Sequence, residues 1–383
     1  MNFNLTDEQR MLEDTVGRLV RDAYGFDKRE QYRKEALGFS TDMWRTFAEL
    51  GLLAVTFAED FGGFDGGGQE LMVVAEGLGR GLVVEPYHAT VVLSGTAIKT
   101  LGNAEQQEQL LGAIASGEAR FALALYEPES FYDATHINTT AEKTASGYRL
   151  NGKKAVVLHG DSADQLVVVA RTSGTNPSAE GLSVFVVPAD AEGVSRRGYP
   201  TIDGLQGADI VLNNVEVGAD ALLGEEGKGW AGIEQAINHG IVALCAEAVG
   251  AMEVACDQTL QYLKEREQFG VVIGQFQALQ HRMVDMRMAL EKARSLTMLA
   301  ASSLEESDEL RNKRLHAAKA MVGKAGALVA EEAIQLYGGM GMMDETPVAH
   351  YAKRIVMIDH LLGDKNYHLQ KLSSLLDVDE EAS

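Results

Sequence analysis

The residues best suited to acid–base chemistry are carboxylates in the C-terminal half of the chain. Glu247 lies in the apolar run LCAEAVGAM, and Asp359 and Asp364 flank the stretch HLLG in MIDHLLGDKNYH. A carboxylate in apolar surroundings is either satisfied by an internal partner or poised to take a proton, because burial disfavours its charged form. Glu247 is the candidate general base, although a structural role is the simpler interpretation of all three.

The composition excludes several classes of partner. The chain of 383 residues has a net charge of −22, so it lacks the basic field that nucleic acid or an anionic membrane surface requires. The first residues, MNFNLTDEQRMLEDTV, are polar and acidic, unlike a signal peptide, and no apolar run approaches the roughly 20 residues of a membrane span. We therefore expect a cytoplasmic protein with no nucleic-acid or membrane partner, in which a few placed arginines would hold any phosphate-bearing cofactor.

The two cysteines give no indication of a disulfide or a metal site. Cys245 and Cys256 fall in one helical pattern, where eleven residues span roughly 16 Å. That separation excludes an intramolecular disulfide and a shared metal ion, so we expect two buried thiols and no metal.

Three regimes of hydrophobic periodicity divide the chain. Residues 1–120 show helical spacing, beginning at the plausible N-cap Thr6 with Glu8 nearby. Residues 121–224 form short β-branched segments of period two, which predict an antiparallel barrel or sandwich. Residues 225–383 contain long helical patterns that normally pack as a bundle. The expected fold class is α+β, mainly α: an N-terminal helical domain, a middle β domain and a C-terminal four-helix bundle.

Two C-terminal motifs carry a resemblance to a known family. The first is EREQFG followed by IGQFQALQ, and the second is IQLYGGMGMMDETPVAHYAKR. In this order, and on these helices, they resemble the signatures of the flavin-dependent acyl-CoA dehydrogenases, and the resemblance covers essentially the whole chain. It implies FAD as the cofactor, an acyl-CoA thioester as the substrate and an electron-transfer flavoprotein as the electron acceptor.

The resemblance also implies which residues contact FAD. Arg266 is a bidentate-capable cation suited to a pyrophosphate, and the loop that carries it reaches, in the family, to the FAD of a neighbouring subunit. The resemblance also places Gly338 and Gly339 beside that cofactor, as glycines because no side chain would fit where the backbone meets it. The candidate cofactor-binding residues are Arg266, Gln268, Phe269, Gln335, Gly338, Gly339, Asp364 and Asn366.

The segments that would hold the chain's own flavin depart from the family pattern. Where the family has Thr-Glu-Pro-x-Ala-Gly-Ser-Asp, this chain has YEPESFYD, with Tyr126 for the threonine and Tyr132 for the serine. In VVLHG, Val156 and Leu158 stand where the family has tryptophan and threonine. A flavin ring bound there would lose hydrogen bonds worth about 1–2 kcal/mol each.

Neither of the two positions at which the family carries its catalytic base has a residue that can accept a proton. Counting from the second motif places Leu362 at one position, and counting back from the first places Gly240 at the other. Glu247 lies seven residues after Gly240, on nearly the same helix face and about 10 Å further along. It is the nearest substitute.

Three functions remain open. The preferred one is a subunit of a heteromeric acyl-CoA dehydrogenase that lends FAD contacts in trans to a catalytic partner, forming a heterotetramer. KAVVLHGDSADQLVVVARTSG and MIDHLLGDKNYHL resemble the small subunit of two-subunit members such as pimeloyl-CoA dehydrogenase. The alternatives are a self-sufficient homotetramer with Glu247 as a displaced base, and a non-catalytic acyl-CoA-binding or structural homologue.

Overall fold

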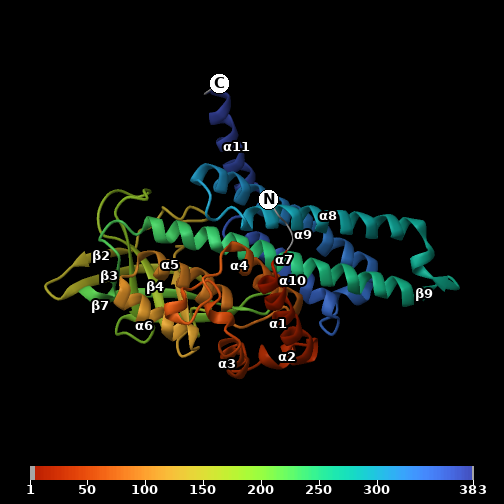
Figure 1. Cartoon of the computed structure of the whole chain (residues 1–383), viewed down its shortest axis with the longest axis horizontal. Helices are drawn as coiled ribbons and strands as arrows, with labels where there is room; N and C mark the ends of the chain where they lie inside the picture. The colour runs from red at the N-terminus through yellow and green to blue at the C-terminus, as the bar shows by residue number, and fades with distance from the viewer. Residues whose placement is uncertain (1–4, 382–383) are drawn as a thin grey trace. The chain divides into compact units, whose positions relative to one another are not determined.

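The structure, a computed structural model, describes residues 5–381, and the chain forms two compact units. The first unit holds the chain up to Glu30, Gly67–Val83 and everything from Ile241 onward, and the second holds Gln31–Gly66 and Val84–Gly240. Helices precede a β domain and long helices follow it (Figure 1). The expected fold class is confirmed.

The first unit is helical apart from one short hairpin. Its long helices α7, α8 and α9 are the most extended elements of the chain (Figure 1), and α7 begins in the second unit. The elements are α1 (Asp7–Ala23), α2 (Phe26–Tyr32, which continues into the second unit), α4 (Gly68–Gly81), α7 (Trp230–Glu265), β9 (Glu267–Gln268), β10 (Val271–Val272), η5 (Ile273–Gln275), α8 (Gln277–Ala301), α9 (Asp308–Tyr337), η6 (Gly338–Met342), α10 (Pro347–His360) and α11 (Lys365–Glu381).

The start of α1 follows from its capping residues. Thr6 is the N-cap, as expected, but its partner is Gln9 rather than Glu8. The Gln9 backbone N–H donates to Thr6 Oγ1 (3.2 Å), and the Thr6 backbone N–H donates to Gln9 Oε1 (2.9 Å). This reciprocal capping box satisfies two N–H groups that have no partner within the helix.

Helices α4 and α7 cross with their backbones in contact at two glycines of the first unit. A Cβ at Gly79 would lie 2.1 Å from the carbonyl oxygen of Glu247, and a Cβ at Gly250 would lie 2.0 Å from that of Glu76. Only glycine allows so close an approach. The crossing fixes the position of Glu247 along α7.

The second unit combines short helices with one sheet. The sheet has the strand order β6-β7-β3-β2-β4-β5-β8, and β1 pairs with β4. Its elements are α3 (Thr41–Glu49), η1 (Leu52–Ala54), η2 (Glu59–Phe61), η3 (His88–Ser94), α5 (Gly95–Leu101), α6 (Ala104–Ala115), β1 (Phe121–Ala124), β2 (Thr140–Lys143), β3 (Gly147–Leu158), β4 (Gln165–Arg171), β5 (Leu182–Pro188), β6 (Val194–Pro200), β7 (Gln206–Gly218), η4 (Ala219–Ala221) and β8 (Leu222–Leu223).

The sheet is mainly antiparallel but not wholly so. Strand β1 pairs with β4 in parallel, with Phe121 opposite Gln165, and β2 has one parallel pair with β4. The prediction of an antiparallel barrel or sandwich is wrong at these two pairings and confirmed at the others. Parallel neighbours need a connecting segment rather than a tight turn, and the flavin-type segment YEPESFYD occupies that connection after β1.

Helix α7 is the one described helix that is long and apolar enough to cross a membrane by length and composition. In its most apolar window, 78% of the residues are buried inside the protein. That burial is typical of the core helix of a helical bundle.

Candidate functional site

The first signature motif forms an exposed arm at the end of α7. Strands β9 and β10 make a two-residue hairpin in which Gln268 pairs with Val271. The side chain of Phe269 is 91% exposed and its φ is +57°, a backbone region that is costly for a non-glycine residue. Arg266 is also exposed, and no acidic side chain among those described forms an ion pair with it. The arm therefore presents a cation and an aromatic ring away from its own core.

The second signature lies beside the base of this arm. The rings of Tyr262 on α7 and Tyr337 on α9 stack with centroids 4.2 Å apart. Tyr337 Oη also donates to the carbonyl of Gln258 (3.1 Å). The stack holds η6 next to the last turns of α7, so the structure brings the two signatures together. Gln335, on the turn of α9 before η6, is exposed.

Gly338 and Gly339 differ in what requires them. Gly338 has φ +65°, which disfavours any side chain. Gly339 has no such conformation, and a Cβ added there would meet nothing within 4 Å. Nothing described in this chain therefore requires glycine at position 339. A group that approaches from outside the chain would explain it, and this fits a cofactor bound against the backbone.

The segment YEPESFYD is anchored by a buried ion pair that the sequence reasoning missed. Glu127 Oε1 accepts hydrogen bonds from Lys154 Nζ (2.9 Å) and Thr139 Oγ1 (2.6 Å), and Oε2 accepts from the Asn138 backbone (2.7 Å). Lys154 Nζ also donates to the carbonyl of Leu125 (3.0 Å). Burial raises the pKa of Glu127, but Lys154 and the other donors outweigh burial and hold it below its ordinary value. Burial lowers the pKa of Lys154 to about 8.

The segments YEPESFYD and VVLHG, which correspond to the family's own-chain flavin pocket, are joined by backbone hydrogen bonding. The positions where the family has tryptophan and threonine are aliphatic here. The backbone N–H of Ala155 donates to the carbonyl of Tyr126 (2.9 Å), which joins the two segments. Val156 follows at a bulge in the β3–β7 pairing, with φ +52° and a half-exposed side chain. Val156 and Leu158 have no side-chain donor or acceptor. The residues present therefore do not fit a flavin ring held by side-chain hydrogen bonds.

A cleft of about 450 Å³ in the second unit is lined by Pro128 of the first segment and by residues of β3, β6 and β7. Arg197 pairs with Asp209 (2.6 Å), and Arg196 Nη1 donates to three carbonyls of the loop after β3. Because cations outnumber carboxylates here in an acidic chain, the cleft favours an anionic group over a cationic one. Its lining residues are Pro128, Lys153, Lys154, Ala155, Ser195, Arg196, Arg197, Asp209, Ile210 and Val211.

The position of the expected base is a tightly fixed turn between α10 and α11. Leu362 has φ +55°, and nothing in its side chain can accept a proton. Fully buried Lys319, on α9, donates to the carbonyls of Ile358 (3.0 Å), Asp359 (2.9 Å) and Gly363 (2.7 Å). A buried ammonium with three acceptors is well satisfied, and its charge complements the C-terminal end of α10. Burial lowers its pKa.

Two histidines complete this turn, and their contacts fix their tautomers. His368 Nε2 lies 3.0 Å from the carbonyl of Leu362, and His368 Nδ1 lies 2.8 Å from Nδ1 of His316. A carbonyl can only accept, so Nε2 of His368 carries the proton. Its Nδ1 then accepts from the protonated Nδ1 of His316, with both rings neutral. Burial and the charge of Lys371 lower the pKa of His316 to about 4, and burial, Lys319 and His316 lower that of His368 to about 3.

The carboxylates that flank the turn have structural partners. Asp364 Oδ1 accepts the backbone N–H of Tyr367 (2.8 Å) and so caps the start of α11, whereas Asp359 Oδ1 accepts that of Lys365 (3.1 Å). Asn366 is exposed on the first turn of α11. The prediction that Asp364 and Asn366 bind the cofactor stays a prediction, and the structure assigns Asp364 a capping role.

Glu247 is engaged in a two-point ion pair. Arg354 on α10 donates from Nε to Glu247 Oε1 (2.5 Å) and from Nη2 to Oε2 (2.8 Å). The side chain of Glu247 is 14% exposed and that of Arg354 is 5% exposed. A general base directs a carboxylate oxygen at the substrate proton, and here Arg354 donates a hydrogen bond to each oxygen of Glu247. The geometry favours the structural interpretation of Glu247. Gly240, in the second unit, is buried.

Comparisons with known proteins match the whole chain. Models of the N-terminal, middle and C-terminal domains of acyl-CoA dehydrogenase match residues 6–118, 122–215 and 227–374. Probable acyl-CoA dehydrogenase YngJ of Bacillus subtilis is 30% identical over 97% of this chain and 98% of its own length. The structure of butyryl-CoA dehydrogenase from Megasphaera elsdenii matches with a TM-score of 0.90 at 28% identity, covering 98% of this chain and 100% of that one.

A second matching structure is the ChsE4–ChsE5 complex of Mycobacterium tuberculosis, with a TM-score of 0.89 at 26% identity and coverage of 98% of this chain and 99% of that one. The fold and its relatives define an oxidoreductase that acts on the CH–CH bond of an acyl-CoA. The chain belongs to the acyl-CoA dehydrogenase family.

Proposed function

We propose that this chain is the subunit of a heteromeric acyl-CoA dehydrogenase that carries no base and lends FAD contacts in trans to a catalytic partner. The observation that carries the proposal is the turn at Leu362. A buried lysine and a histidine fix its carbonyls, and the Leu362 side chain cannot take a proton. The turn is built as a stable structure without a base.

The division of labour follows from the residues present. FAD supplies the acceptor for the hydride that leaves the β carbon of the thioester. Arg266 would hold the pyrophosphate, because its exposed guanidinium can donate two parallel hydrogen bonds. Gly339 leaves room for the cofactor against its backbone, and the exposed ring of Phe269 would exclude water beside it. The carboxylate that removes the α proton, with a raised pKa in a dry pocket, comes from the partner.

The homotetramer with Glu247 as its base has less support. It requires Glu247 to leave Arg354, which separates two largely buried opposite charges, and breaking a buried pair in this way costs about 3–5 kcal/mol. It also requires a flavin ring to bind beside Val156 and Leu158, which have no side-chain hydrogen-bond donor.

Co-expression tests the proposal. The tagged chain expressed alone should retain little FAD and show no acyl-CoA oxidation, whereas the chain purified with its partner should carry roughly one FAD per pair of subunits and oxidise an acyl-CoA. Full flavin occupancy and turnover by the chain alone would sink the proposal. In the complex, Arg266→Ala should perturb the flavin absorbance spectrum, and an unchanged spectrum would favour a structural or acyl-CoA-binding homologue.

A further inference from the structure

Phe131, in the segment YEPESFYD, combines an exposed ring with an unfavourable backbone conformation. Its side chain is 87% exposed and its φ is +49°. A bulky residue at positive φ is disfavoured by the contact of its Cβ with the backbone, and an exposed ring leaves apolar area in water. Phe64, in the same unit, is also exposed but has no such φ. Single exposed apolar residues are common, but strain at the same residue indicates a function.

The turn that carries Phe131 is held on both sides. The backbone N–H of Asp133 donates to the carbonyl of Ser130 (2.9 Å) and closes a turn with Phe131 at its second position. Ser130 is buried, and its Oγ donates to the carbonyl of His136 (2.6 Å) and accepts from the backbone N–H of Glu127 (3.1 Å). Glycine favours positive φ in turns, and the family pattern of this segment has glycine here. The chain thus keeps the turn and adds a fixed aromatic ring to it.

Two exposed carboxylates flank the ring. Glu129 and Asp133 lie two residues to either side of Phe131. Asp133 Oδ1 accepts from the backbone N–H and the hydroxyl of Thr135 (2.9 and 2.6 Å), which leaves its charge in place. Within the part of the chain that the structure describes, neither carboxylate forms an ion pair. Such a loop repels a phosphate-bearing cofactor and attracts an apolar protein surface with a basic rim.

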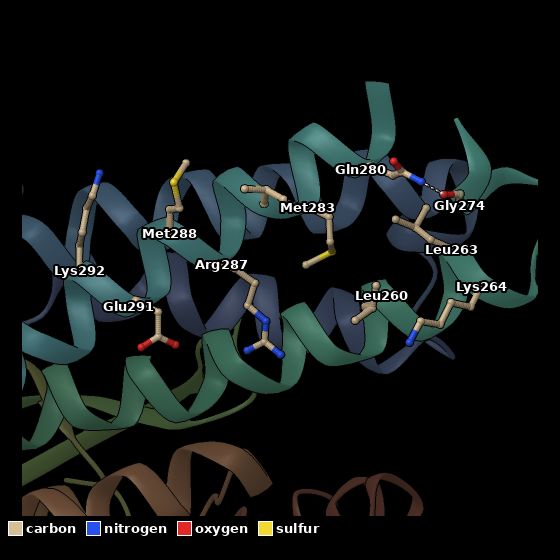
Figure 2. A pocket seen from close by; sticks show the side chains of 11 residues that line it. Leu260, Leu263, Lys264, Gly274, Gln280, Met283, Arg287, Met288, Glu291 and Lys292 are labelled. Carbon is tan, nitrogen blue, oxygen red and sulfur yellow. Dashed lines mark hydrogen bonds between the residues drawn. The ribbon is translucent and has the colours of Figure 1, made fainter. Parts of the chain in front are cut away.

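A groove of the chain itself shows what such a surface contains. It lies between the last turns of α7 and the first half of α8 and has a volume of about 740 Å³ (Figure 2). Its lining includes the apolar residues Leu260, Leu263 and Met283 and the basic residues Lys264 and Lys292 (Figure 2). A second copy of this chain is therefore the competing occupant. Two chains that each have a net charge of −22 repel each other, so the loop favours a different polypeptide.

We propose that Phe131 is the anchor by which this chain docks the base-bearing subunit, and that the partner presents an apolar pocket rimmed by lysine or arginine. The ring enters the pocket, and Glu129 and Asp133 face the basic rim. A rigid aromatic side chain loses little conformational freedom on binding, which makes it an effective anchor. The inference rests on the proposed function, because that function supplies the partner.

Phe131→Gly separates an anchor from a structural ring. Glycine accepts the positive φ, so the melting temperature of the isolated chain should stay the same or rise. Loss of the ring should raise the dissociation constant of the complex with the partner about tenfold or more. Phe131→Tyr keeps the ring and should bind the partner as the wild type does, and Phe64→Ala is the matched control for an exposed ring. Titration of each chain with the purified partner subunit gives the constants, and wild-type affinity in the glycine variant overturns the proposal.

Glu129→Lys tests the basic rim. It places a cation opposite cations, so the dissociation constant should rise about tenfold at low salt and by less at high salt, because salt screens exposed charges. Glu118→Lys, at an exposed position of the same unit, should leave the constant unchanged. If the ring instead stacks on a phosphate-bearing cofactor, Glu129→Lys would increase the FAD retained by the chain alone, and that result overturns the proposal.

Photo-cross-linking identifies the occupant directly. In the purified complex, Phe131→p-benzoylphenylalanine should cross-link to apolar residues of the partner subunit that lie beside a lysine or arginine, and the same change at Phe64 should not. A cross-link only to a second copy of this chain, or none to the partner, overturns the proposal. The complex would then still hold FAD and oxidise an acyl-CoA, so the proposed function would stand. If no FAD-bearing complex forms, both proposals fail.

Discussion

The guanidinium of Arg354 on α10 donates to both carboxylate oxygens of Glu247 on α7, although the two residues are 107 positions apart in the chain. Glu247 lies on α7 where Gly79 and Gly250 bring the backbones of α4 and α7 into contact. The close contact restricts movement of α7 at this residue. A charge-assisted, two-point contact of this kind is among the stronger polar contacts in proteins. It indicates that Glu247 was retained for structure.

Glu247→Gln separates a structural carboxylate from a base. We expect the variant to lose about 2 kcal/mol of unfolding free energy, because an uncharged amide replaces the carboxylate and one of its two charge-assisted hydrogen bonds with Arg354 is lost. Acyl-CoA oxidation by the complex should be retained at a temperature where the variant is folded. Urea unfolding and steady-state turnover measure the two effects, with the exposed Glu331→Gln as the control. A folded variant with no turnover would restore Glu247 as the base.

Lys319→Met tests whether the buried lysine stabilises the turn at Leu362, the position where the family carries its base. Methionine has a similar length but no donor, so the carbonyls of Ile358, Asp359 and Gly363 would lose their shared partner. Unsatisfied buried acceptors cost about 1–3 kcal/mol each when no water reaches them. We expect a loss of about 3 kcal/mol or more and faster amide exchange at residues 361–366. Lys324→Met, at an exposed position on the same helix, should show neither effect. An equal loss of stability in both variants would contradict the stabilising role of Lys319.

The histidine pair predicts acid sensitivity with a definite sign. The folded-state pKa values of His316 and His368, about 4 and about 3, lie below the ordinary 6.5, so the unfolded chain binds more protons between pH 3 and 6.5. The stability is therefore fully present above pH 6.5 and falls as the pH drops through this window, by at most about 1.4 kcal/mol per pH unit for each ring.

His316→Gln isolates this contribution, because the glutamine amide can still donate to His368 but does not titrate. Urea unfolding at a series of pH values between 4 and 7 should give a shallower slope for the variant than for the wild type. The exposed His281→Gln variant supplies the control for losing an ordinary histidine. Parallel slopes for all three proteins would show that the pair does not titrate as described.

The sequence predicted what depends on local pattern. Helical periodicity predicted the long C-terminal helices, and this prediction is confirmed because each pattern is continuous along the chain. The roles of Arg266 and Leu362 follow from the resemblance of the two motifs to the family, and they stay predictions. The pairing of β1 with β4 was not predicted, because strand direction depends on the path of the connecting segment.

The partners of buried charges could not be predicted from the sequence. Arg354 meets Glu247, and Lys319 meets a turn some 40 residues further on, only because α7, α9 and α10 pack together. A signal did exist for Lys319, which shares a helical row with the apolar residues Leu315 and Val322 and so faces inward. That row predicts a buried lysine but does not name its acceptors, since they belong to another helix.

Gly339→Ala is the sharpest test of the contacts made in trans. Within this chain the added methyl group meets nothing, and alanine restricts the unfolded chain more than glycine does. The isolated variant should therefore be as stable as the wild type or more stable by about 0.4–1 kcal/mol. In the complex, the methyl group should intrude on the cofactor and lower flavin retention after gel filtration. Gly112→Ala in α6, where an added Cβ also meets nothing, should keep both the stability and the flavin. If Gly339→Ala also keeps its flavin, the cofactor does not approach this backbone, and the glycine has some other origin.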